Sequence, residues 1–147
     1  MKILINRVYQ NYKDDNCHEA WIQAQLTSNR EIKIFDPDCL IPKDCENKII
    51  DCLISLMIWE EAPYFTELSG KYLGRHRISS IERAKYVIPT YLKDLNIDKR
   101  NYLEGLYAFQ TEEGLFFVEQ DRLHGKEGEE IKIKVFRFDV FAWCPIQ

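Results

Sequence analysis

The clearest pattern in the chain lies in residues 18–35, with the sequence HEAWIQAQLTSNREIKIF. Every second residue from Ala20 to Leu26 is apolar, and residues 31–35 alternate again after a polar turn at residues 27–30. A period of two residues is typical of a strand with one buried face. The stretch therefore predicts a β-hairpin, with Trp21 on the face that points away from the core.

Strand patterns also dominate the rest of the chain. Residues 48–59, KIIDCLISLMIW, are nearly all apolar and predict a long buried strand, with a helix as the alternative. Residues 105–109 and 115–118 predict a second hairpin around Gly114. Residues 130–141 predict one long amphipathic strand with a solvated face.

The middle of the chain has a different character. Residues 60–103 lack a sustained alternation and are expected to be helical or irregular. Ser79 and Glu82 have the spacing of a capping box, which predicts a short helix beginning there. Pro89 limits residues 85–92 to an edge strand or the end of a strand.

The strand patterns of residues 31–59 and 128–141, separated by acidic turns such as residues 126–129, resemble an OB-fold barrel. The resemblance implies a mainly β fold, a small closed or semi-closed barrel with one or two short helices. An α+β fold, with an antiparallel sheet packed by helices, is the alternative if residues 48–59 are helical. We expect a single domain spanning residues 1–147. OB-like barrels bind single-stranded nucleic acid, oligosaccharides or proteins across one sheet face.

Composition narrows the class of protein. The chain has 147 residues, of which 46% are hydrophobic and 13% aromatic, enough to form a substantial core. No apolar run approaches the ~20 residues that span a bilayer, and the N-terminus lacks the apolar stretch of a secretion signal. We therefore expect a cytoplasmic protein without a membrane partner. The five cysteines are an odd number, which favours reduced thiols over a disulfide framework.

Charge is distributed unevenly in this acidic chain. The formal net charge is −4, yet residues 71–100 contain eight basic and three acidic side chains. Within this basic segment, residues 70–77 (GKYLGRHR) combine cations, aromatic rings and glycines, which suit the backbone and bases of a single strand. The candidate contact residues are Trp21, Tyr72, Arg75, His76, Arg77, Arg83 and Tyr86.

Sequence motifs for catalysis are absent, including the nucleotide-binding, zinc-protease and serine-hydrolase patterns. We predict no catalytic residue, no metal site and no cofactor. Cys17 paired with a histidine (His76 or His124) is the alternative for a hydrolase. Asp36 and Asp38, with Asp14–Asp15, are the alternative for a divalent-cation site, although such residues are also common in turns.

These observations favour a non-enzymatic interaction module whose protein partner is unidentified. The first alternative is an OB-type protein that binds single-stranded nucleic acid through the basic segment, residues 71–100. The second is a small acidic inhibitor or immunity-type protein that blocks a basic partner through Asp14, Asp15, Glu60 and Glu61.

Overall fold

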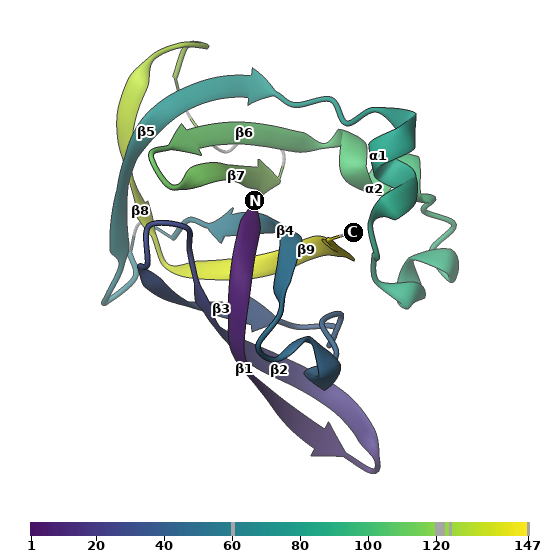
Figure 1. The fold of residues 1–147 in the computed structure, drawn as a ribbon. Helices are drawn as coiled ribbons and strands as arrows, with labels where there is room; N and C mark the ends of the chain where they lie inside the picture. The colour runs from purple at the N-terminus through teal and green to yellow at the C-terminus, as the bar shows by residue number, and fades with distance from the viewer. Residues whose placement is uncertain (60, 120–122, 124, 147) are drawn as a thin grey trace.

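The computed structural model describes residues 1–59, 61–119, 123 and 125–146 (Figure 1). The strands of this part of the chain are β1 (Lys2–Lys13), β2 (Asn16–Gln25), β3 (Glu31–Asp36), β4 (Ile49–Met57), β5 (Thr66–Arg75), β6 (Leu106–Thr111), β7 (Gly114–Glu119), β8 (Glu130–Val135) and β9 (Arg137–Pro145). The helices are α1 (Ser80–Lys85) and α2 (Lys99–Glu104), with short 3-10 helices at η1 (Lys43–Cys45) and η2 (Thr90–Lys93).

Five strands close into a barrel in the order β1-β2-β3-β9-β4, and β4 pairs back onto β1. β3 and β9 run parallel, whereas the other neighbours in the barrel run antiparallel. This arrangement confirms the mainly β class and is consistent with an OB-like barrel at the level of the fold. β4 also confirms the strand predicted over residues 48–59, so the helical alternative is wrong.

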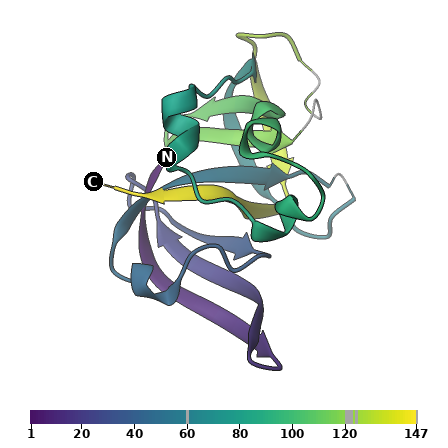
Figure 2. The ribbon, with the colours of Figure 1, turned by 90° about the vertical axis from the view of Figure 1, so that its right-hand side faces the viewer.

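A second sheet, β7-β6-β5-β8, is inserted between barrel strands β4 and β9. It joins the barrel where β7 runs parallel beside β4, with Ser55 opposite Phe117. α1, η2 and α2 gather on one side of the molecule (Figure 2). The β6–β7 hairpin confirms the hairpin predicted around Gly114. β5, by contrast, lies within residues 60–103, which the sequence predicts to be helical or irregular.

The short helix predicted from the capping box is confirmed. The Ser79 hydroxyl accepts a hydrogen bond from the Glu82 backbone N–H at 3.2 Å, and α1 begins at Ser80. A serine at this position satisfies one of the backbone donors that a helix leaves free at its start. Downstream of α1, Val87 forms an isolated antiparallel bridge with Trp143, in keeping with the limit that Pro89 sets.

The single strand predicted over residues 130–141 is wrong in detail, because the chain bends at Phe136. β8 pairs with β5 in the second sheet, whereas β9 pairs with β4 in the barrel. The Phe136 N–H donates to the Met57 carbonyl at 2.8 Å and so marks where the chain passes between sheets. The amphipathic pattern continues through this bend.

The main core fills the barrel and continues into the second sheet. It includes Ile22, Ile34 and Ile54, each with no exposed surface. A smaller core beside the helices contains Leu103, Phe117 and Phe141. Alternate residues of β2 point into the barrel as predicted, and Trp21 lies on its outer face.

Candidate ligand groove on the outer face of the barrel

A shallow groove crosses the outer face of β2 and β3. It consists of two adjoining hollows of about 350 and 560 Å³, which share Trp21 and residues 31–33 in their linings. Tyr9 of β1 lies at one end, while Tyr64 and residues 136–138 line the other. The β2–β3 face is the surface that OB-type barrels use for extended ligands.

Aromatic rings and cations are in contact along this groove. Trp21 and Phe35 are direct cross-strand neighbours, with ring centroids 4.8 Å apart. The Lys33 Nζ lies 4.6 Å from the Trp21 ring centroid, and the Arg137 Cζ lies 4.4 Å from that of Phe35. Such contacts hold each ring and each cation in a fixed position on the barrel surface.

The local charge of the groove differs from that of the whole chain. Its lining includes three cations, Arg30, Lys33 and Arg137, and one carboxylate, Glu31. Asp139, which lies outside this lining, accepts two hydrogen bonds from Arg137, at 2.6 and 2.9 Å. This pairing raises the pKa of the Arg137 guanidinium and fixes its plane over Phe35.

A second aromatic cluster lies at the Tyr64 end of the groove. Phe136 contacts both Tyr64 and Trp59, with centroid distances of 5.6 and 5.1 Å. Tyr64 is 67% exposed and Trp59 is 48% exposed, which is unusual for such large rings. Exposed rings held by a partly buried neighbour form a stable apolar surface on which a flat group can stack.

The residues of the basic segment singled out from the sequence lie elsewhere. Arg75 donates to the Glu104 carbonyl and Arg83 to the Ile78 carbonyl, at 3.4 and 2.8 Å. The His76 ring packs 5.2 Å from that of Phe117, and burial lowers the pKa of its imidazole. Tyr86 is half-buried, and burial raises the pKa of its hydroxyl; Arg77 is exposed.

Within the described residues, Trp21 is the candidate contact residue that lines the groove. Tyr72 differs from its expected role as an exposed stacking ring, because its side chain is buried in the main core and only 5% exposed. Gly70 and Gly74 belong to β5, so the segment 70–77 is largely strand and not a phosphate-binding loop. Sequence reasoning missed Lys33, Phe136 and Arg137.

Comparison with known proteins gives no relative from which a function could be transferred. No protein-family model matches the chain, and no curated protein or solved structure is significantly similar to it. In the part of the chain that the structure describes, no helix has the length and apolarity needed to cross a membrane. The same residues contain no cluster of three or more side chains suited to hold a metal ion.

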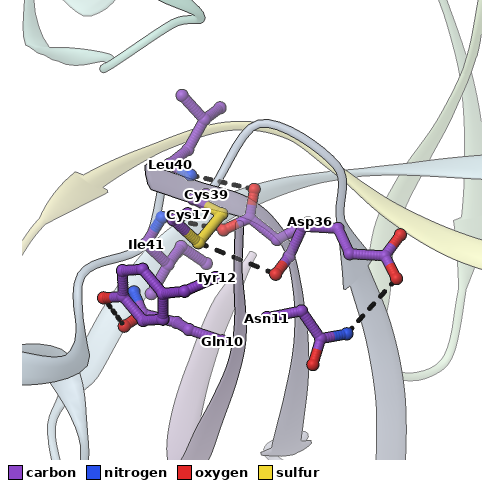
Figure 3. The surroundings of a disulfide bond; sticks show 9 residues. Gln10, Asn11, Tyr12, Cys17, Asp36, Cys39, Leu40 and Ile41 are labelled. Atoms are coloured by element: carbon purple, nitrogen blue, oxygen red, sulfur yellow. Dashed lines mark hydrogen bonds between the residues drawn. A yellow bond between two sulfur atoms is a disulfide. The ribbon is translucent and has the colours of Figure 1, made fainter. Parts of the chain in front are cut away.

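A disulfide joins Cys17 to Cys39 at the end of β2 away from the turn with β3 (Figure 3). The expectation that all five cysteines are free thiols is therefore wrong for this pair. β2 and β3 pair as far as Ala20 and Asp36, and the turn that follows β3 brings Cys39 to Cys17, with 6.3 Å between their Cα atoms. Disulfides are more typical of oxidising compartments, so the cytoplasmic location stays a prediction.

The structure does not support two of the alternative sites suggested by the sequence, the cysteine–histidine pair and the aspartate cation site. Cys17 has no thiolate to act as a nucleophile, and His124 lies outside the described residues. Asp14 and Asp15 form the tight β1–β2 turn with positive φ angles, whereas Asp36 is fully buried. Glu60 of the acidic-inhibitor hypothesis also lies outside the described residues.

Asp36 has a structural role at the end of β3. Its carboxylate oxygens accept hydrogen bonds from the Leu40 and Ile41 backbone N–H groups, each at 2.9 Å (Figure 3). Desolvation raises the pKa of the carboxyl group, and the two hydrogen bonds partly oppose the rise. Asp36 thus holds the loop that carries Cys39 in place.

This burial predicts a pH-dependent stability. Because the folded pKa of Asp36 is above its ordinary value of 3.8, the folded protein binds the proton more tightly than the unfolded chain. The native protein should therefore have a higher free energy of unfolding than the Asp36→Asn variant at low pH. This difference should shrink as pH rises from the ordinary pKa of the carboxyl group through its raised pKa in the folded protein. Urea unfolding of both proteins between about pH 4 and 7 measures this difference. A difference that grows with pH would contradict the argument, and Asp44→Asn, at an exposed carboxylate, is the control.

Proposed function

We propose that this protein is a binding module for single-stranded nucleic acid, with the groove on the outer face of β2 and β3 as its site. The contact of Lys33 with the Trp21 ring, next to that of Arg137 with Phe35, carries the proposal. Bases stack on aromatic and guanidinium planes, while cations neutralise the phosphates between them.

The electrostatics of the groove support single-stranded nucleic acid as its ligand, in preference to the acidic surface of another protein. Three cations and one carboxylate line the groove of a chain whose net charge is −4, and two of the cations, Arg30 and Arg137, form ion pairs with Glu113 and Asp139 outside that lining. The flat, partly exposed rings of Trp21, Tyr64 and Phe136 offer stacking surfaces along it. An extended single strand uses both features at once, because its bases and phosphates alternate.

The direct test is a titration of fluorescent single-stranded DNA and RNA with the purified protein. Neutralising about three phosphates gives a salt slope near −2 for a single strand, so affinity should fall about 20-fold between about 50 and 200 mM salt. Binding of neither oligonucleotide at the lower salt would overturn the proposal. The groove would then be assigned to a protein partner, and pull-down experiments would follow.

Lys33→Ala is expected to reduce affinity about fivefold and to flatten the salt slope by roughly 0.7, because one phosphate contact is lost. Lys93→Ala is the matched control, since Lys93 is an exposed lysine of the basic segment outside the groove. Equal losses for the two variants would mean that binding follows general charge and not the groove. A larger loss of affinity in Lys93→Ala than in Lys33→Ala would indicate that the binding site lies in residues 71–100.

A further inference from the structure

We propose that the Cys17–Cys39 disulfide is a thiol–disulfide exchange site, whose co-substrate is a small dithiol and whose reduction releases the tip of the β1–β2 hairpin. The hairpin tip is defined here as residues 10–19. It extends beyond the rest of the barrel (Figures 1 and 2). The proposal rests on how this tip is attached, on access to the sulfurs, and on the burial of the other cysteines.

The hairpin tip is tied to the barrel by one bond. β2 pairs with β3 only from Ala20 onward, so residues 16–19 have β1 as their strand partner. The hydrogen bonds of the tip's side chains, such as Asn11 to Glu19, remain within the hairpin. Among the described residues, the disulfide is the one side-chain bond that links the tip to a segment outside the β1–β2 hairpin, whose own backbone pairing continues through Gln10 and Ala20.

The other end of the disulfide is anchored independently. Asp36 accepts hydrogen bonds from the Leu40 and Ile41 N–H groups, and the Leu40 carbonyl accepts one from the Trp143 Nε1 at 2.7 Å. The loop that carries Cys39 therefore keeps its place when the sulfurs part. Loss of the bridge should affect the hairpin tip and leave the closed barrel intact.

The disulfide is open to attack from solvent. Cys17 and Cys39 both line a hollow of about 480 Å³ between the barrel and the segment that contains Val87 and Tyr91. The three remaining cysteines are buried, and burial raises the pKa of each thiol, to about 12 for Cys52. Thiolates are the reactive form, so exchange is confined to the half-buried pair, Cys17 and Cys39.

The reaction is ordinary disulfide exchange. A thiolate of the dithiol bonds to one Sγ, the S–S bond breaks, and the other Sγ leaves as a thiolate. The second thiol of the dithiol then attacks the dithiol's own sulfur in this mixed disulfide and displaces the cysteine Sγ, so that Cys17 and Cys39 each end as a thiol and the dithiol becomes a cyclic disulfide. The dithiol supplies both electrons, and an added disulfide oxidant reverses the reaction.

The effect on the groove rests on the proposed function. Tyr9 and Trp21 are cross-strand partners at the base of the hairpin tip, and both line the groove. A mobile tip makes this end of the groove less well ordered. Ordering it on ligand binding then costs more conformational entropy. We expect the reduced protein to bind a single-stranded oligonucleotide about three- to tenfold more weakly than the oxidised protein.

The test combines dithiothreitol treatment of the folded protein with alkylation, mass spectrometry and amide hydrogen exchange. Two cysteines, Cys17 and Cys39, should be alkylated, and exchange in residues 10–19 should rise at least tenfold while β3, β4 and β9 are unchanged. The Cys17→Ser/Cys39→Ser variant should match the reduced protein and ignore dithiothreitol. Faster exchange across the barrel, an unchanged tip, or a disulfide that resists reduction until the protein unfolds would each overturn the proposal. If neither redox form binds oligonucleotide, the proposed function fails while the exchange result still decides this inference.

Discussion

Replacement of Trp21 with alanine is expected to weaken binding of a single-stranded oligonucleotide by about tenfold or more. Alanine substitution of a ring that stacks a base costs about 1–3 kcal/mol, which corresponds to this range of affinity. Trp21 also orients Lys33, whose Nζ lies over its ring, so its removal disturbs a phosphate contact too. Fluorescence anisotropy with a labelled oligonucleotide at low salt measures the effect.

The matched control for Trp21 is Tyr91→Ala. Tyr91 is 47% exposed and lines the separate hollow beside the disulfide, so it is a large exposed ring outside the groove. Its removal should leave affinity within about twofold of the native protein. Trp21→Phe should retain most of the binding, because a phenyl ring still stacks a base. Native affinity in Trp21→Ala, with the fold intact by circular dichroism, would remove Trp21 from the site.

The Gly70→Ala substitution should cost about 3 kcal/mol of stability and lower the midpoint of thermal unfolding by roughly 10 °C. A Cβ at this position would clash with the Gln110 carbonyl oxygen, and it would lie only 2.9 Å from the Phe109 Cζ. Both neighbours belong to β6, and Phe109 is fully buried, so neither moves without disturbing the sheet. Differential scanning calorimetry measures the shift.

Gly105→Ala provides the control at the end of α2. No atom lies within 4 Å of a Cβ built at Gly105, and its φ of −85° suits any residue. Its unfolding midpoint should stay within a few degrees of the native value, or rise slightly because alanine restricts the unfolded chain. If the Gly70→Ala protein were as stable as Gly105→Ala, β5 and β6 would have to move apart for the added methyl group with no loss of stability, which would contradict the prediction.

Local periodicity predicted those parts of the fold that depend on neighbours in the chain. The alternation from Ala20 to Leu26 identified β2, its buried face and the outward position of Trp21. The Ser79 cap identified the start of α1. By contrast, β5 has glycines at two positions, and glycine breaks the pattern of side chains on which strand prediction depends.

The groove depends on pairings between distant parts of the chain. Arg137 reaches Phe35 because β3 and β9 run side by side, and no local pattern indicates that pairing. The bend at Phe136 is equally hidden, since no glycine or proline marks it and apolar residues continue on both sides. The charge of residues 71–100 likewise gave no guide to the groove, because none of these residues is in its lining.

The disulfide, like the groove, was not indicated by the local pattern. The turn predicted at residues 27–30 would place Trp21 opposite Asp36, whereas the observed register places it opposite Phe35. β3 ends at Asp36, and Cys39 follows in a turn with a positive φ angle, so its position depends on the loop that Asp36 holds. The odd number of cysteines argued only that at least one is unpaired.

The insertion of the second sheet between β4 and β9 also means that the barrel is closed by residues far apart in the sequence. β9 closes the barrel by pairing Ile50 with Pro145 and Ile34 with Phe138. Hairpins β1–β2 and β6–β7 join residues that are close in the sequence, at little cost in chain entropy. Closure by β9 brings the ends of a much longer loop together, so we expect it to follow the formation of these hairpins during folding.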